Sequence, residues 1–172
     1  MPFKRYIVEE MVEPELKVEY PPEPGEDASP GELAAHKRAM KERVIEALVD
    51  LMAKSGEIRN RSKFVKEFVR REEASTSAIG NGVALPHLRS MRPRKLVVAV
   101  ARSTAGVEYN SPDGKPVKLF FCITAPPYDD NVYLRFYKWV ATELMSEQWL
   151  MEALMEAKDA HEMVRILRGL YY

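Results

Sequence analysis

The chain contains a single cysteine, Cys122, and only three histidines among its 172 residues. One cysteine excludes an intrachain disulfide and any zinc site built from several cysteines. Three scattered histidines leave little material for a metal site or for a relay of imidazoles. If this protein uses histidine chemistry, we expect one histidine to carry it, and we expect no metal and no cofactor.

The chain also has no net charge, because 26 Lys+Arg balance 26 Asp+Glu, and it has no long apolar run. A protein that binds a polyanion normally carries a basic excess, so neutrality argues against nucleic acid as a partner. The longest strongly apolar run, Leu96–Ala101, is far shorter than the ~20 residues of a membrane helix. The first ten residues lack an apolar signal core. We expect a cytoplasmic protein with no direct insertion into a membrane.

The composition, with 46% hydrophobic and 30% charged residues, is that of an ordinary globular domain. Residues 21–30 differ, because they hold four prolines and three acids and therefore predict a solvated loop. We expect residues 1–30 to form an N-terminal extension with this Pro- and acid-rich loop, and residues 31–172 to form the domain. Within the extension, Glu15–Tyr20 alternates apolar and charged residues. This alternation fits a half-buried strand or a mobile tail, and the residues leave both open.

Helical periodicity begins at Pro30, and apolar residues recur at three- and four-residue steps as far as Met52. Gly56 stands where a C-terminal cap is expected. A second helix is predicted over Ser62–Arg71, and three more follow residue 129. The expected caps of these three are Asp129 or Asp130, Ser146, and the capping box formed by Asp159 and Glu162.

Two strands are predicted between the helices, at Lys95–Arg102 and Val117–Thr124. Both are nearly continuous in apolar residues, as central strands covered on both faces are. Cys122 lies in the second and is expected to be a buried small hydrophobe. Helices before and after a block of strands indicate a three-layer α/β fold, with a mixed central sheet of about four to five strands flanked by helices.

The segment with chemistry in it ends at His87. A strand-like stretch, Val83–Leu85, stops at Pro86, which lacks a backbone donor, and His87 follows where the strand runs out. Ligands of α/β sheets often bind at such strand ends. The two glycines within residues 80–82 allow the backbone to turn tightly or to approach another group.

Positive charge surrounds this histidine in an otherwise neutral chain. The cluster consists of Arg89, Arg92, Arg94 and Lys95. A neutral imidazole is a good nucleophile, and a guanidinium can hold phosphoryl oxygens by charge-assisted hydrogen bonds. The neighbourhood therefore suits a phosphorylated histidine. A histidine after a proline is more often a loop or core residue, however, and the residues alone leave both interpretations open.

The run Thr76-Ser-Ala-Ile-Gly-Asn-Gly-Val-Ala-Leu-Pro-His87 closely resembles the active-site signature of type-2 enzyme IIA domains. These domains belong to the fructose/mannitol and nitrogen-regulatory branch of the phosphoenolpyruvate-dependent phosphotransferase system. The resemblance extends over roughly residues 44–167. It implies that His87 accepts a phosphoryl group from the phosphocarrier protein HPr. The family also has an Arg-Glu pair sixteen residues before its histidine, which implies that Arg71 stabilises the phosphoryl group, with Glu72 beside it.

The sequence departs from the family pattern at two positions. Many members carry a second histidine on the helix after the core strand, and Tyr133 stands at that position. A phenol can donate a hydrogen bond to a phosphoryl oxygen but cannot carry positive charge. The residue after the active histidine is usually small, whereas here it is Leu88, which with Arg89 is expected on the partner-docking rim. Thr76 is expected either to contact the phosphoryl group or to stabilise the turn.

The resemblance therefore predicts a phosphocarrier that takes its phosphoryl group from an HPr-like protein. It would pass that group to enzyme IIB in sugar transport, or act on a regulatory protein target as in nitrogen regulation. The alternative is a regulatory protein-binding module with the same fold and little or no onward phosphotransfer. The other two histidines, His36 and His161, are expected to be solvated or at a helix start without a catalytic role.

Overall fold

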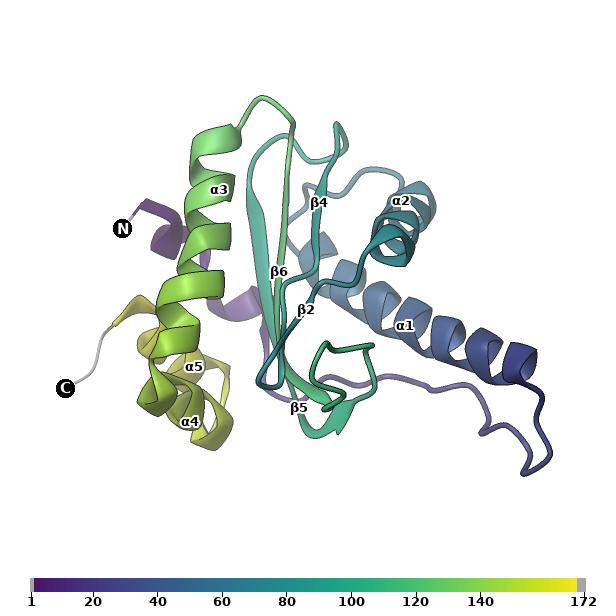
Figure 1. Cartoon of the computed structure of the whole chain (residues 1–172). Helices are drawn as coiled ribbons and strands as arrows, with labels where there is room; N and C mark the ends of the chain where they lie inside the picture. Colours follow the sequence, from purple (N-terminus) through teal and green to yellow (C-terminus); the bar gives the residue numbers. More distant parts are fainter. Residues whose placement is uncertain (1, 170–172) are drawn as a thin grey trace.

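The computed structural model describes residues 2–169 of the chain. Its helices are η1 (Pro2–Tyr6), η2 (Glu9–Met11), α1 (Pro30–Ala53), α2 (Arg61–Ala74), α3 (Asp130–Lys138), η3 (Trp139–Leu144), α4 (Gln148–Glu156) and α5 (Ala160–Arg168). Its strands are β1 (Val12–Glu13), β2 (Ala78–Gly80), β3 (Val83–Ala84), β4 (His87–Arg89), β5 (Val97–Val107) and β6 (Val117–Ala125). Helices α1 and α2 cover one face of the sheet, and α3, α4 and α5 cover the other (Figure 1). This confirms the predicted three-layer α/β fold.

The sheet is mixed and has six strands, slightly more than the four or five expected. Its order is β1-β5-β6-β3-β2, and β4 also pairs with β6. The two long strands β5 and β6 are antiparallel, whereas β1 runs parallel to β5, and β3 and β4 run parallel to β6. The short strands β3 and β4 therefore follow one another along the same side of β6.

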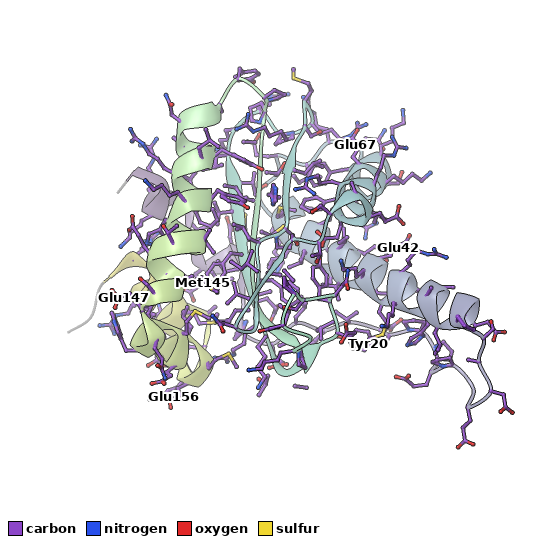
Figure 2. All side chains as sticks on the ribbon, viewed as in Figure 1. Tyr20, Glu42, Glu67, Met145, Glu147 and Glu156 are labelled. Carbon is purple, nitrogen blue, oxygen red and sulfur yellow. The ribbon has the colours of Figure 1, made fainter. Side chains whose placement is uncertain are left out.

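Each face of the sheet has its own apolar core, because side chains alternate along β6. Leu119, Phe121 and Ile123 belong to the core beneath α3, α4 and α5. Phe120 and Cys122 belong to the core beneath α1 and α2. All five side chains are buried, which confirms the prediction for Cys122 and explains why this strand has no polar alternation. Figure 2 shows the two helical layers carrying different labelled side chains: Glu42 and Glu67 on the α1 and α2 side, and Met145, Glu147 and Glu156 on the other.

The N-terminal strand lies before the segment Glu15–Tyr20, for which the sequence left a strand and a mobile tail open. Val12–Glu13 pairs with β5, and Pro14 follows, so the ladder ends there. The expected strand over Glu15–Tyr20 is absent from the described structure, apart from one hydrogen bond that the Leu16 N–H donates to the Arg102 carbonyl (2.7 Å). The chain then runs along the underside of α1 to the start of that helix (Figure 1). The division at residue 30 stays a prediction.

The Pro- and acid-rich loop covers His36, contrary to the expectation that this histidine is solvated. The side chain of His36 is 12% exposed, and its Nε2 lies 3.7 Å from a carboxylate oxygen of Glu23. The loop folds back towards the first turns of α1, where Pro22, Pro24 and Gly25 line the same pocket as His36. His161, in contrast, is 66% exposed, as expected.

Several helix ends differ from their predicted caps. Ser146 does not cap α4, because its Oγ donates to the Glu143 carbonyl (2.9 Å) and the N-cap is Glu147. Asp159 does cap α5 by accepting from the Glu162 N–H (2.8 Å). The helix after Asp129 continues to Leu144 as predicted, but its second half is a π-helix. Within residues 2–169, no helix combines the length and the apolar character needed to cross a membrane.

Candidate functional site

His87 opens strand β4, whereas the sequence placed it just beyond the end of a strand. Ala84 pairs with Phe120 and His87 pairs with Ile123, so β3 and β4 keep one register along β6. Between them the ladder is interrupted at Leu85 and Pro86, where proline has no N–H to donate. The Leu85 carbonyl instead accepts a hydrogen bond from Nδ1 of His87, at 2.7 Å. The interruption therefore fixes the orientation of the imidazole.

The glycine-containing turn of the signature joins strands β2 and β3. Gly80, Asn81 and Gly82 all have positive φ values, of 90°, 54° and 76°, which glycine tolerates and most residues do not. The Asn81 N–H donates to the Asp113 carboxylate at 2.9 Å. This and the hydrogen bond from the Lys115 N–H lower the pKa of Asp113. The turn thereby joins the β2–β3 hairpin to the loop before β6.

Arg71 reaches His87 from the last turn of α2. Its Nη2 lies 2.7 Å from Nε2 of the imidazole, and its Nη1 donates to the Ser75 carbonyl at 3.2 Å. Because Nδ1 of His87 donates its hydrogen to Leu85, Nε2 carries the lone pair and accepts from Arg71. The structure thus brings together the two residues that the signature and the sixteen-residue spacing singled out.

Burial lowers the pKa of the half-buried His87, and the positive charges of Arg71 and Arg89 lower it further. The hydrogen bond to the Leu85 carbonyl acts in the opposite direction but is the weaker effect. The imidazole is therefore neutral at neutral pH. A neutral ring with a lone pair on Nε2 is the nucleophilic form of histidine.

Two tyrosines of α3 form an aromatic wall beside the imidazole. The ring centroids of Tyr133 and Tyr137 lie 6.4 Å and 5.1 Å from that of His87, both in edge-to-face arrangements. The Arg89 guanidinium lies over the Tyr133 ring, 4.6 Å from its centroid. Burial raises the pKa of Tyr133 to about 12, so its hydroxyl stays protonated and is able to donate. Sequence reasoning missed Tyr137, although its four-residue spacing from Tyr133 places both on one helix face.

Glu72 and Thr76 lie in a second layer, against the loop that follows α2. The Glu72 carboxylate is 3% exposed and accepts hydrogen bonds from Lys41 Nζ (3.1 Å) and the Ser77 N–H (2.8 Å). The Thr76 hydroxyl donates to the Tyr109 carbonyl at 3.2 Å. These bonds hold the loop behind Arg71. Lys41 could not be found from the sequence, because it comes from the distant helix α1.

Leu88 and Arg89 complete strand β4 beside the imidazole. Leu88 is half-buried and packs against the core beneath α1 and α2, while its carbonyl accepts from the Thr124 hydroxyl at 2.7 Å. Arg89 is exposed. Of the two residues expected on a docking rim, Arg89 is therefore the one whose side chain lies mainly at the surface.

Comparisons with known proteins identify the family of this chain. The family model for "Phosphoenolpyruvate-dependent sugar phosphotransferase system, EIIA 2" matches residues 33–169. The chain is 32% identical over 129 residues to the fructose-specific EIIA component of Haloferax volcanii, covering 75% of this chain and 83% of that protein. It is 30% identical over 124 residues to the nitrogen regulatory protein of Bradyrhizobium diazoefficiens, covering 71% and 80%.

A longer relative and a solved structure show the same domain. The chain is 32% identical over 127 residues to the fructose-specific EIIABC component of Bacillus subtilis, but this covers only 20% of that protein. The fold is that of the nitrogen regulatory protein IIA-Ntr from Neisseria meningitidis, with a TM-score of 0.78, 22% identity, and coverage of 97% of this chain and 99% of that one. The chain belongs to the type-2 enzyme IIA family of the phosphoenolpyruvate-dependent sugar phosphotransferase system.

Proposed function

We propose that this protein is a phosphocarrier whose His87 accepts a phosphoryl group on Nε2 from a phosphorylated HPr-like protein. One observation carries the proposal: Nδ1 of His87 is tied to the Leu85 carbonyl, which leaves the lone pair of Nε2 beside the Arg71 guanidinium. A nucleophile and a cation for the phosphoryl oxygens thus occupy the same place.

In the transfer step, the Nε2 lone pair of His87 attacks phosphorus and forms an N–P bond. The N–P bond of the donor phosphohistidine breaks, and its electron pair returns to the donor imidazole. The acceptor ring keeps its Nδ1 hydrogen and gains positive charge, which strengthens the hydrogen bond to the Leu85 carbonyl. Arg71 then exchanges its contact with Nε2 for contacts with phosphoryl oxygens. No proton has to leave the site during this step.

Onward transfer to an enzyme IIB protein completes the proposal. A solved complex of enzyme IIA mannitol with phosphorylated enzyme IIB from Escherichia coli has the same fold, with a TM-score of 0.62 and 19% identity, covering 76% of this chain and 88% of that one. The fructose-specific names of two relatives support a sugar as the final acceptor. Exposed Arg89 and half-buried Leu88 beside the imidazole suit contact with such partners.

Labelling with phosphoenolpyruvate, enzyme I and HPr tests the proposal. Wild-type protein should gain acid-labile phosphate, and NMR should place it on Nε2 of His87. The His87→Ala variant should gain none, whereas His36→Ala and His161→Ala should label as wild type. Unlabelled wild type, or a labelled His87→Ala variant, would show the proposal to be wrong.

A regulatory module without onward transfer is the second candidate. It is favoured by the 30% identity to a nitrogen regulatory protein of which this chain covers 80%. Adding purified enzyme IIB to the phosphorylated protein separates the two. Loss of the label from His87 to enzyme IIB supports the carrier, whereas retention of the label, with binding of another protein that depends on residue 87, supports the regulatory module.

A further inference from the structure

Arg71 has three carboxylates within four residues of it on α2: Glu67, Glu72 and Glu73. Among the side chains that the structure describes, no carboxylate forms an ion pair with Arg71, whose guanidinium contacts His87 and a backbone carbonyl. Glu72 and Glu73 follow Arg71 by one and two positions, and side chains so spaced do not face each other on a helix. The carboxylate that is placed to compete for Arg71 is therefore Glu67.

Glu67 stands at the position that favours an ion pair with Arg71. Side chains four residues apart lie on one face of a helix, and an acid four residues before a base is the preferred order. Both side chains are half-buried and extend towards the segment that starts with β4, where Arg71 contacts His87 and Glu67 contacts Ser90. A carboxylate also binds a guanidinium more strongly than a neutral imidazole does, because both partners are charged. Helix geometry alone would therefore draw Arg71 away from the imidazole.

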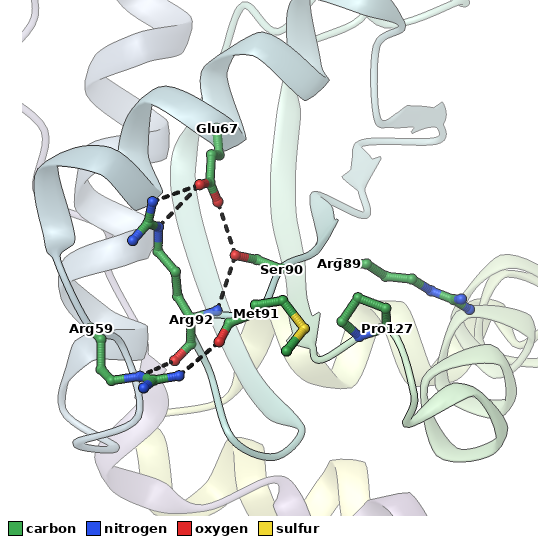
Figure 3. A pocket seen from close by; sticks show the side chains of 7 residues that line it. All are labelled: Arg59, Glu67, Arg89, Ser90, Met91, Arg92 and Pro127. Atoms are coloured by element: carbon green, nitrogen blue, oxygen red, sulfur yellow. Dashed lines mark hydrogen bonds and ion pairs between the residues drawn. The ribbon is translucent and has the colours of Figure 1, made fainter.

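Both oxygens of the Glu67 carboxylate are occupied by the loop that follows β4 (Figure 3). Oε1 accepts from Nε and Nη2 of Arg92, at 3.1 Å and 2.8 Å, and Oε2 accepts from the Ser90 hydroxyl at 2.9 Å. The Arg92 side chain is only 23% exposed, so solvent screens this ion pair less than it screens a surface pair. Glu67 thus neutralises an arginine that is distant in the sequence and not the one on its own helix.

Contacts that do not involve Glu67 hold Arg92 in place. The Ser90 N–H donates to the carbonyl of the last residue of β6 at 3.1 Å. Arg59 donates to the carbonyls of Met91 and Arg92, both at 2.8 Å, as Figure 3 shows. The backbone of this loop is therefore fixed by the sheet and by Arg59, and it presents the Arg92 guanidinium to α2.

We propose that Arg92 is a positioning residue for the reaction at His87. It occupies the Glu67 carboxylate and thereby leaves the Arg71 guanidinium to the imidazole. The inference rests on the proposed function, because it concerns the rate at which His87 takes up a phosphoryl group. A guanidinium that already lies beside Nε2 does not have to leave a carboxylate before it meets the phosphoryl oxygens, so its orientation is set before the reaction begins.

Replacing Arg92 and then its partner tests the proposal. The readout is kcat for labelling of His87 at a saturating concentration of the phosphorylated HPr-like protein. Arg92→Met frees the Glu67 carboxylate to bind Arg71, and if about one molecule in ten keeps Arg71 on the imidazole, kcat falls about 10-fold. Glu67→Gln/Arg92→Met removes the competing carboxylate as well and keeps the net charge of wild type. Its kcat should return to near the wild-type value.

Three single variants serve as matched controls. Glu67→Gln leaves no charge to draw Arg71 away and should label like wild type. Arg92→Lys keeps a cation for Glu67 and should retain most of the wild-type kcat. Arg59→Met removes one positive charge from the pocket that Arg92 also lines, but it leaves the ion pair of Glu67 and Arg92 in place. This variant should also label like wild type.

A merely structural role of the ion pair predicts a different pattern. If Glu67 and Arg92 only tie the loop to α2, Glu67→Gln should slow labelling as much as Arg92→Met does, and the double variant should not recover. That pattern, or a normal kcat in Arg92→Met, overturns the proposal. If Arg92→Met does not fold by circular dichroism, Arg92→Gln takes its place, and we again expect a loss that Glu67→Gln reverses.

NMR titration of His87 distinguishes failure of this positioning from failure of the proposed function. Burial lowers the pKa of His87, and the charge of Arg71 lowers it further. The charged groups that act on the imidazole come from α2 and β4: Arg71, Glu72 and Arg89. In Arg92→Met, the pKa should rise as Arg71 moves to Glu67, and in the double variant it should return. This result would support the positioning even if wild type accepts no phosphoryl group. An unchanged pKa in Arg92→Met, or an equal rise in the double variant or in Arg59→Met, overturns it.

Discussion

Arg71 and Arg102 show how differently two guanidinium groups of one chain are used. Arg102, on β5, is 8% exposed and donates to four backbone carbonyls: Pro14 (2.8 Å), Leu154 (2.8 Å), Met155 (3.1 Å) and Ala157 (2.8 Å). Three of these lie at the C-terminal end of α4, where the helix dipole is negative. Arg71 donates to one carbonyl and to the imidazole of His87.

The difference lies in what would happen if each arginine moved. The carbonyls around Arg102 are fixed parts of the fold, and losing their donor would leave them buried without partners. In the proposed function, the nitrogen that faces Arg71 is the reacting atom, and a phosphoryl group on it would offer oxygens that bind a guanidinium more strongly. The contacts of Arg102 are therefore those of a stabilising residue, whereas the proposed function gives Arg71 a part in the chemistry.

Replacing Arg71 should produce the largest effect. Arg71→Met removes the cation that faces the transferring phosphoryl group, so the rate of His87 labelling should fall about 10²- to 10³-fold. The free energy of unfolding should change by only about 0.5 kcal/mol, because the side chain is partly exposed. Labelling kinetics and urea unfolding measure the two quantities. A Met variant that labels normally would remove the contrast between the two arginines.

Replacing Arg102 should lower the stability of the protein and leave the rate of His87 labelling unchanged. Arg102→Met leaves the four carbonyls without their donor and should lower the free energy of unfolding by about 3 kcal/mol. The fraction of molecules that remains folded should label at His87 at the normal rate. Arg168→Met is the matched control: within residues 2–169, Arg168 donates to one backbone carbonyl, that of Ile7 (3.0 Å), and its replacement should cost about 1 kcal/mol. Equal losses of unfolding free energy in the two variants would mean that the four carbonyls around Arg102 stabilise the fold no more than the single contact of Arg168.

Removing one hydroxyl from the aromatic wall should, like the replacement of Arg71, slow the labelling of His87, but by a smaller factor. Tyr133→Phe keeps the packing but removes a protonated donor, so we expect labelling to slow by about 5-fold, the equivalent of one neutral hydrogen bond. Tyr137→Phe is the control and should label like wild type. If both variants slow equally, the phenol of Tyr133 has no individual role in holding the phosphoryl group.

The smallest effect should appear in the pH dependence. Because the folded protein lowers the pKa of His87, labelling should stay constant down to pH values below the ordinary histidine pKa of about 6.5. Stability should likewise be constant above about pH 6.5, decline as the pH falls from there to the lower pKa of the folded state, and level off below it, because only the unfolded chain takes up the proton in that interval. Arg71→Met should move the NMR titration of His87 upward. An unchanged or lower midpoint would contradict the influence of Arg71.

The resemblance and the local patterns located the candidate pair His87 and Arg71 but not the residues that support it. The signature and the sixteen-residue spacing identified His87 and Arg71, which lie 2.7 Å apart. They did not reveal Lys41, because its ion pair with Glu72 joins two helices through residues that lie 31 positions apart in the sequence. They also misjudged His36, because its burial depends on how the Pro- and acid-rich loop folds back over α1.

The sequence by itself determined the features that depend on near neighbours. These are the apolar periods of α1 and β6, the capping of α5 by Asp159, and the left-handed turn at Gly80 and Gly82. Only the tertiary structure decided which imidazole nitrogen of His87 keeps its lone pair, since that follows from a carbonyl released where β3 and β4 meet along β6. Only it decided which groups the two arginines contact. The few histidines limited the chemistry to one ring, and contacts between distant segments determined how that ring is held.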